Sequence, residues 1–194
     1  MDDAVETIEY RGHQIRVHTD ENSFNPRKEF DNLNTMYCSH CRYLLGDVQV
    51  KSSEELKEKL QELGPHLSLP LYLYDHSGIT MNTTGYSCPW DSGQVGIIAI
   101  SIAKIKKVYG WKVLTKARRE QILGYLRNEV EQYDQYLTGE VYGYVIRGSD
   151  EETIDSCWGF YGSDHKASGL LESARGAIDA ELDKVGEQQV LAVA

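Results

Sequence analysis

The sequence lacks any hydrophobic run long enough to cross a membrane. No segment of its 194 residues approaches the roughly 20 consecutive apolar residues that a membrane-spanning helix needs. The first ten residues, MDDAVETIEY, are acidic and contain neither the basic start nor the apolar segment of a secretory signal peptide. These absences predict a cytoplasmic protein with no membrane partner.

The sequence also has few cysteines, which are Cys38, Cys41, Cys88 and Cys157. Disulfide frameworks are typical of oxidising compartments, so we do not expect one in a cytoplasmic chain. A four-cysteine zinc ribbon needs two CxxC pairs, and only the pair of Cys38 and Cys41 is present. Free buried thiols are the simplest interpretation of the four residues.

Positive charge is scarce as well, because 20 Lys and Arg residues stand against 30 Asp and Glu residues, for a net charge of −10. Proteins bind the nucleic-acid backbone through Lys and Arg, so this balance argues against direct nucleic-acid binding. Residues 104–119 contain seven basic residues and no acidic one, which leaves a net charge of −17 on the remainder. The sequence thus predicts one locally basic surface and one broad acidic surface. The acidic surface either attracts a basic protein groove or serves solubility.

The sequence does contain enough apolar side chains for a packed core, since 41% of its residues are hydrophobic. Alternating apolar and polar residues over 7–19 predict a β-hairpin, and the same pattern predicts an antiparallel pair over 141–147 and 153–161. Two apolar runs, 69–74 and 95–102, predict further strands.

Capping residues mark the predicted helix starts. Ser52 and Glu55 form a capping box, Ser101 is the predicted cap of a short helix, and Thr115 is that of a long one. A last helix is predicted over 164–184. The helical spacing of apolar residues predicts which side chains face the core. They are Ile102, Ile105 and Val108 in the short helix, and Ile122, Leu126, Val130, Tyr133 and Leu137 in the long one.

Strands at both ends of the sequence with helices between them predict an α+β fold around a mostly antiparallel sheet with three to four helices. We expect residues 1–184 to form a single domain. Residues 20–34, in which Asn25-Pro26 is a predicted breaker, are expected to form a loop. Residues 185–194 show no sign of a packing partner and are predicted to be a flexible tail.

The block between the two apolar runs carries most of the candidate chemistry. It holds Asp75, His76, Ser77, Ser87, Cys88, Asp91 and Ser92 in a predicted loop of about twenty residues, and loops on rigid scaffolds often carry function. Three interpretations remain open. The polar side chains satisfy backbone groups in turns, or Asp75, His76 and Asp91 hold one divalent metal ion. Alternatively the loop is catalytic, with His76, Cys88 and Asp91 as the candidates: carboxylates beside His76 orient it as a general base, or Cys88 or Ser87 is a nucleophile paired with His76.

A second metal hypothesis rests on the segment YCSHCRY. Cys38, His40 and Cys41 can bind zinc if Cys88, Cys157 or His76 supplies a fourth ligand. In a strand, however, the first two side chains face one side and the third faces the other, which makes a poor chelate.

Two further segments have both a functional and a structural interpretation. In 104–119, Tyr109 and Trp111 lie among lysines, so that they either stack on nucleic-acid bases or pack the junction of two solvated helices. In 157–162, CWGFYG, glycine permits close approach of a ligand or of another backbone segment.

Five segments of the sequence resemble an uncharacterised family of small proteins carried by phages and mobile elements. They are EFDNLNTMYCSHCRYLLGD, LPLYLYDHSG, CPWDSGQVGIIAIS, YDQYLTGEVYGYVI and DSCWGFYG, and the resemblance spans about residues 8–162. Its most specific parts are YDHSG at 74–78 and CPWDSGQ at 88–94. Cys38 and His40 match the family pattern, whereas Cys41 stands where the family often has arginine, which weakens the zinc hypothesis.

The resemblance implies a counter-defence protein acting in the cytoplasm of a bacterial host. Small acidic proteins of this kind occupy the basic nucleic-acid groove of a CRISPR or restriction effector. We therefore expect a non-enzymatic inhibitor whose partner is a host defence complex with a basic surface. The alternative is a metal-dependent enzyme or nucleotide-binding protein that uses residues 75–92. A third hypothesis is a nucleic-acid module built on residues 104–119. The target and the oligomeric state stay open.

Overall fold

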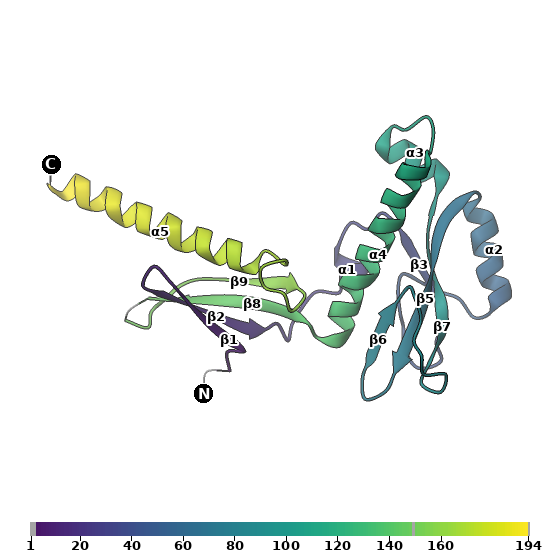
Figure 1. Ribbon diagram of the computed structural model, residues 1–194, viewed down its shortest axis with the longest axis horizontal. Helices are drawn as coiled ribbons and strands as arrows, with labels where there is room; N and C mark the ends of the chain where they lie inside the picture. The colour runs from purple at the N-terminus through teal and green to yellow at the C-terminus, as the bar shows by residue number, and fades with distance from the viewer. Residues whose placement is uncertain (1–2, 149, 194) are drawn as a thin grey trace. The chain divides into compact units, whose positions relative to one another are not determined.

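The computed structural model describes residues 3–148 and 150–193, with side chains described as far as Lys184. The contacts of the chain divide it into two compact units. The terminal unit combines Met1–Phe24 with Gly139–Ala194, and the central unit is Asn25–Thr138. Each combines a mostly antiparallel sheet with helices, which confirms the predicted α+β class (Figure 1). That residues 1–184 form one domain stays a prediction.

The sheet of the central unit has five strands in the order β4-β3-β7-β5-β6. They are β3 (Thr35–Cys38), β4 (Val48–Gln49), β5 (His66–Asp75), β6 (Ile79–Asn82) and β7 (Ser92–Ser101). All neighbouring strands are antiparallel except β3 and β4. The two apolar runs of the sequence therefore form the paired strands β5 and β7, as their composition predicts.

Helices cover both faces of this sheet (Figure 1). They are α2 (Ser53–Leu63) on one face and α3 (Ile102–Tyr109) and α4 (Lys116–Thr138) on the other, while the short helix α1 (Pro26–Glu29) packs against α4. The α4 stripe of Ile122, Leu126, Val130 and Tyr133 is buried, as predicted. On the opposite face, α2 packs Leu56, Leu60 and Leu63 against Tyr37, Val50 and Ala99.

The predicted caps are confirmed, because the side chains of Ser52, Ser101 and Thr115 each accept a hydrogen bond from a first-turn amide. One inward prediction was wrong: Val108 is 54% exposed. Ile105 is buried in the core, and Tyr109, one turn further along the helix, packs against the same core. The inner face of α3 therefore contains Ile105 and Tyr109 and does not include Val108.

The expected loop over 20–34 contains the short helix α1. Asn25 is its N-cap, accepting a hydrogen bond from the Arg27 amide at 2.9 Å, and Pro26 occupies the first turn. Proline has no amide hydrogen to lose at that position and its fixed φ suits a helix start. Asn25-Pro26 therefore begins an element instead of breaking one.

The terminal unit has a four-stranded antiparallel sheet in the order β1-β2-β8-β9, with the helix α5 packed on one face. Its elements are β1 (Glu6–Tyr10), β2 (His13–Thr19), β8 (Val141–Arg147), β9 (Thr153–Tyr161) and α5 (Leu170–Val193). Leu170, Ala174 and Ile178 of α5 are buried in one cluster with Ile15, Val17, Tyr144 and Ile146 of the sheet. Both predicted hairpins are thus confirmed.

Both predicted ends of the last helix differ from the structure. The carboxylate of Asp164 accepts from the amides of Lys166 and Ala167 in a turn, and α5 begins only at Leu170. At its other end α5 continues past Lys184 to Val193, through most of the expected tail, whose side chains lie outside the described residues. None of the described helices is both long enough and apolar enough to span a bilayer.

Candidate functional site

The predicted loop between β5 and β7 contains a strand of its own. β6 pairs antiparallel with β5, and a tight turn at Ser77 and Gly78, both with positive φ, joins them. The amide of His76 donates to the Gly78 carbonyl at 3.0 Å across this turn. A strand of four residues carries too little periodicity to be recognised in the sequence, so the expectation of one long loop was wrong.

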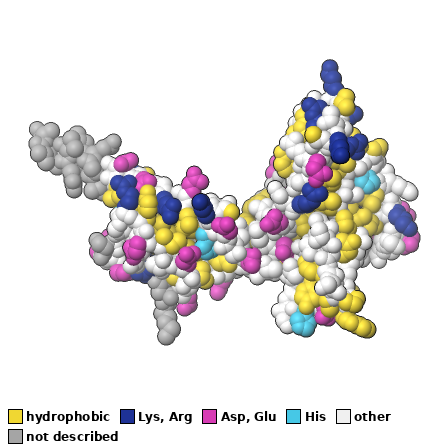
Figure 2. Space-filling model, in the orientation of Figure 1, with side chains coloured by type: hydrophobic (Ala, Val, Ile, Leu, Met, Phe, Trp, Pro, Cys, Tyr) yellow, Lys and Arg dark blue, Asp and Glu magenta, His cyan; other side chains and the backbone are white. Residues whose placement is uncertain are grey.

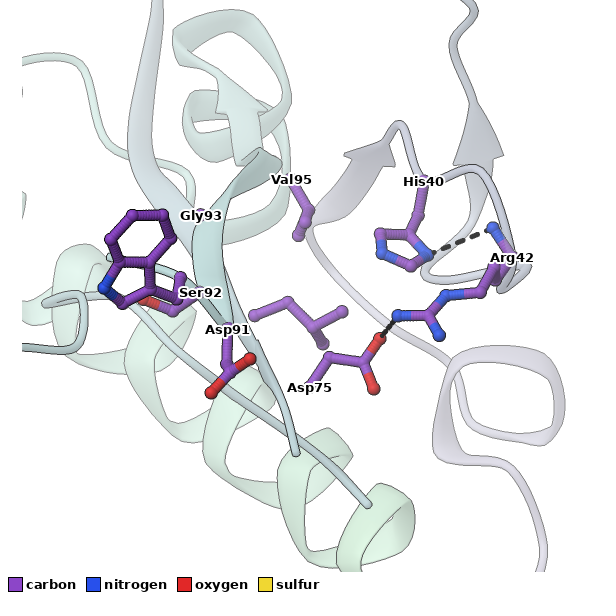
Figure 3. A pocket seen from close by; sticks show the side chains of 9 residues that line it. His40, Arg42, Asp75, Asp91, Ser92, Gly93 and Val95 are labelled. Carbon is purple, nitrogen blue, oxygen red and sulfur yellow. Dashed lines mark hydrogen bonds and ion pairs between the residues drawn. The ribbon is translucent and has the colours of Figure 1, made fainter. Parts of the chain in front are cut away.

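The ends of β5 and β7 and the segment after β3 surround a cavity of about 280 Å³ (Figure 3). It is lined by His40, Arg42, Leu73, Asp75, Trp90, Asp91, Ser92, Gly93 and Val95. Three candidates from the sequence, His40, Asp75 and Asp91, are thus brought to one place. Figure 3 shows His40 and Arg42 on one side, Asp91 and Ser92 on the other, and Asp75 between them.

Asp75 is engaged by the protein itself. Its carboxylate forms an ion pair with the Arg42 guanidinium and accepts a hydrogen bond from the Tyr43 hydroxyl at 3.3 Å. The Asp75 amide donates to the carbonyl of Asp91 at 2.8 Å, which ties the two strand ends together. The Asp75 carboxylate therefore already has two partners within the protein, the Arg42 guanidinium and the Tyr43 hydroxyl.

Asp91 stands between the other two candidates for catalysis. Its Oδ2 lies 3.3 Å from Nδ1 of His76 and 3.6 Å from the Sγ of Cys88. A cysteine nucleophile needs the imidazole next to the thiol, with a carboxylate behind the imidazole. Here the carboxylate lies between the imidazole and the thiol, so the contacts of His76, Cys88 and Asp91 are not those of an activated thiol.

His40 has one ring nitrogen already in use. The amides of Arg42 and Tyr43 donate to Nδ1 at 3.3 and 3.2 Å, and the ring stacks on Tyr43 with centroids 5.0 Å apart. Because Nδ1 accepts hydrogen bonds, the neutral imidazole carries its proton on Nε2. His40 therefore stabilises the turn after β3 and has only Nε2 left for a ligand.

Cys38 and Cys41 lie in different environments. Cys38 is fully buried in the core, whereas Cys41 is exposed. Burial, reinforced by the nearby Asp47 carboxylate, raises the pKa of Cys38 to about 12, so its thiol stays protonated. Zinc binds thiolate, so a protonated Cys38 does not favour a zinc site.

Across residues 3–148 and 150–184, no three His, Cys, Asp or Glu side chains are grouped closely enough to hold a metal ion. Neither Asp75, His76 and Asp91 nor Cys38 and His40 form a complete ligand set within this part of the chain. The metal assignments stay predictions, which a bound ion in solution would support.

The basic segment 104–119 uses its aromatic residues internally. Tyr109 and Trp111 stack with ring centroids 4.6 Å apart, and the Arg118 guanidinium lies 4.7 Å from the Trp111 ring centroid. Both aromatic residues pack against the core of the central unit. This arrangement favours the packing interpretation, with the lysines on the solvated surface of α3 and α4 (Figure 2).

The net negative charge of the chain comes from the terminal unit. That unit has six Lys and Arg residues against 17 Asp and Glu residues, a net charge of −11. The central unit has 14 against 13, a net charge of +1. The broad acidic surface expected from the composition therefore belongs to one of the two units.

Comparison of the chain with protein-family models, with curated proteins and with solved structures finds no match. The resemblance to phage-borne proteins thus stays a prediction.

Proposed function

We propose that the protein is a non-enzymatic inhibitor that binds a basic surface of a host nucleic-acid-processing defence complex, of the CRISPR or restriction type, in the bacterial cytoplasm. The observation that carries the proposal is the net charge of −11 on the terminal unit. An acidic surface attracts a groove lined with Lys and Arg, speeds the encounter and competes with nucleic acid for the groove. The sequence resemblance indicates the kind of host target.

The central cavity supports a protein that binds without catalysis. Asp75 is paired with Arg42 and Tyr43, and Asp91 lies between Cys88 and His76. An enzyme of the expected type would need one of these carboxylates or the thiol in an activated state. The contacts of these side chains are instead those that fix the ends of β5 and β7.

DNA cleavage by a guide-loaded single-protein CRISPR nuclease and by a type I restriction enzyme tests the proposal. The protein is added either before or after the DNA substrate. We expect inhibition of at least one enzyme when the protein is added first, and little when DNA already fills the groove. Equal inhibition in both orders, or none with either enzyme, contradicts the proposal.

A second candidate function, nucleotide binding with or without a metal ion, is favoured by one observation. Trp90 is 92% exposed beside a cavity that also holds Arg42 and His40. An indole can stack on a base while a guanidinium binds phosphate. Titration with ATP and magnesium should then change the tryptophan fluorescence of the wild type and not of Trp90→Phe. An unchanged signal in the wild type contradicts this candidate.

The metal part of the second candidate has its own measurement. Elemental analysis of dialysed, tag-free protein should find about one equivalent of zinc, calcium or manganese if Asp75, His76 and Asp91 complete a site. Asp91→Ala should then lose the ion. Metal-free wild-type protein contradicts the assignment.

A further inference from the structure

One face of the sheet in the terminal unit is covered by α5, and the other carries an aromatic row. His18 of β2 pairs in register with Gly143 of β8. On the far side of Gly143, Trp158 of β9 reaches back toward His18, with ring centroids 6.3 Å apart. Because side chains alternate along a strand, this row faces away from Val17 and Cys157, which pack in the cluster with α5.

A glycine at position 143 leaves room for the Trp158 indole on this face of the sheet. A Cβ at Gly143 would come within 2.2 Å of the Trp158 ring, so the indole lies directly on the strand where no side chain stands. The register between β8 and β9 shifts here, and Gly159 has a φ of +86°. Such a bulge redirects a side chain, and bulges are common beside functional sites. Trp158 nevertheless remains 47% exposed.

We call the face that carries His18 and Trp158 the platform. Residues 20–24, the segment after β2, form a wall beside it. The Asp20 amide donates to the Val141 carbonyl at 2.7 Å, and the Asn22 amide donates to the Asp20 carboxylate at 3.1 Å. The Tyr161 hydroxyl donates to the carbonyl of Phe24 at 2.5 Å. The wall is thus anchored to β8 and β9, although the Phe24 ring is 65% exposed.

Platform and wall line an open cavity of about 620 Å³. Its aromatic lining is Trp158, Phe24 and His18, and its carboxylates are Asp3, Asp20 and Glu21. No Lys or Arg is among the lining residues that the structure describes. Two large exposed aromatic rings beside three carboxylates disfavour an anion and suit a cation with a flat, weakly hydrated surface.

We propose that this cavity binds an arginine side chain of the protein partner. The guanidinium stacks on the Trp158 indole and pairs with the carboxylates of Asp20 and Glu21. Guanidinium is planar and stacks on aromatic faces, whereas the ammonium of lysine is a compact, strongly hydrated charge, so arginine fits this lining better. The inference rests on the proposed function, since a basic nucleic-acid groove is the surface that would present such an arginine.

Titration of ¹⁵N-labelled protein with the peptide acetyl-Gly-Arg-Gly-Arg-Gly-amide tests this site. The chain has three tryptophans, so three indole N–H signals report on Trp90, Trp111 and Trp158 separately. We expect the Trp158 signal to shift and the other two to stay. The citrulline peptide, which has the same shape without the charge, should leave all three signals unchanged.

Variants give the matched controls. Trp158→Ala should weaken peptide binding about tenfold, because the stacking surface is lost. Trp90→Ala removes the exposed indole of the central unit, which is 92% exposed against 47% for Trp158, and should leave peptide binding unchanged. Glu21→Gln should weaken binding about threefold, whereas Glu172→Gln, an exposed carboxylate on α5, should not.

Three results overturn the site: a Trp158 signal that does not move, one that moves equally with the citrulline peptide, and one that moves equally with acetyl-Gly-Lys-Gly-Lys-Gly-amide, in which lysine replaces both arginines. The proposed function can fail separately. If the arginine peptide binds at Trp158 and no defence enzyme is inhibited, the result supports the arginine site and contradicts the proposed function. If a defence enzyme binds wild type and Trp158→Ala equally, the result contradicts the arginine site and supports the proposed function.

Discussion

At the scale of single residues, Arg27 is a charged residue of the central unit whose side chain is only 1% exposed. Its guanidinium donates to Asp47 at 3.0 and 2.5 Å and to Glu129 at 2.7 Å. It also donates to the Asn34 carbonyl at 2.8 Å. Burial opposes its charge, but these carboxylates outweigh burial and raise the pKa of Arg27. One residue thereby joins α1, α4 and the segment before β4.

Arg27→Met should lower the free energy of unfolding by about 3–5 kcal/mol, because it leaves two partly buried carboxylates without their counter-charge. Urea unfolding measures the loss. Arg42→Met is the matched control, since the Arg42 side chain is 65% exposed and its ion pair with Asp75 should contribute less than about 1 kcal/mol. Similar losses in the two variants would contradict this account of Arg27.

The thiol of Cys38 predicts a pH dependence. Its folded pKa of about 12 exceeds the 9.0 of an ordinary cysteine, so between these values the unfolded chain loses a proton that the folded chain keeps. Stability from this group is therefore complete below pH 9.0 and is lost as the pH rises toward about 12. Unfolding free energies measured across this range should fall less steeply in Cys38→Ala than in wild type. Parallel curves would show that Cys38 is not the source.

Sequence reasoning found some of these residues and missed others for a physical reason. His40, Asp75 and Asp91 stood out because titratable residues were concentrated in short segments, and the structure brings them to one cavity. Arg27 and Arg42 were missed because their partners lie up to 102 and 33 residues away. The sequence contains no local signal for a charge pair of that separation.

At the scale of elements, the edge strand β6 depends on α4. Oδ1 of Asp134 accepts from the Thr80 hydroxyl at 2.8 Å and from the Met81 amide at 2.6 Å. An edge strand otherwise leaves its outer amides unpaired. This carboxylate therefore connects the hairpin of β5 and β6 to the long helix.

Asp134→Ala should cost about 1–3 kcal/mol, because a partly buried amide and a hydroxyl lose their acceptor. Hydrogen exchange at the Met81 amide should become faster than in wild type, while amides in the centre of β7 keep their protection. Asp134→Asn, which retains Oδ1, should restore most of the protection. Unchanged exchange at Met81 in the alanine variant would contradict the proposed support of β6.

The predicted elements depend on how local their signals are. The start of α2 was readable because Ser52 and the Glu55 amide lie within one turn. The stripe of α4 was readable because 23 residues show the helical period. Strand β6 and helix α1 have four residues each, too few for periodicity to appear. The bulge opposite Gly143 was marked only by the glycine at 159.

At the scale of the whole molecule, charge is divided between the two units. The terminal unit is formed by both ends of the chain, with β1 and β2 beside β8 and β9. The sequence shows the net charge of −10 and the basic run of 104–119. It does not show that the two acidic ends share one sheet, because strand pairing across more than a hundred residues has no local signal. The partition of −11 and +1 follows only from the topology.

Two triple variants with the same change in net charge test this division. The first is Asp3→Asn, Asp20→Asn and Glu21→Gln in the terminal unit, and the second is Glu54→Gln, Glu58→Gln and Glu62→Gln on α2 of the central unit. The first should weaken binding to the basic partner about tenfold, because it removes carboxylates of the contact surface. The second should have little effect. Equal losses would mean that net charge alone matters.

The most direct test of the central claim is the affinity of the protein for a purified defence effector as a function of salt. Association with an immobilised, guide-loaded CRISPR nuclease or a type I restriction enzyme is measured between about 100 and 500 mM sodium chloride, where screening lengths fall sharply. We predict a stable complex with at least one of them whose affinity falls steeply as salt rises. Binding that is insensitive to salt, or no binding to either effector, would contradict the account.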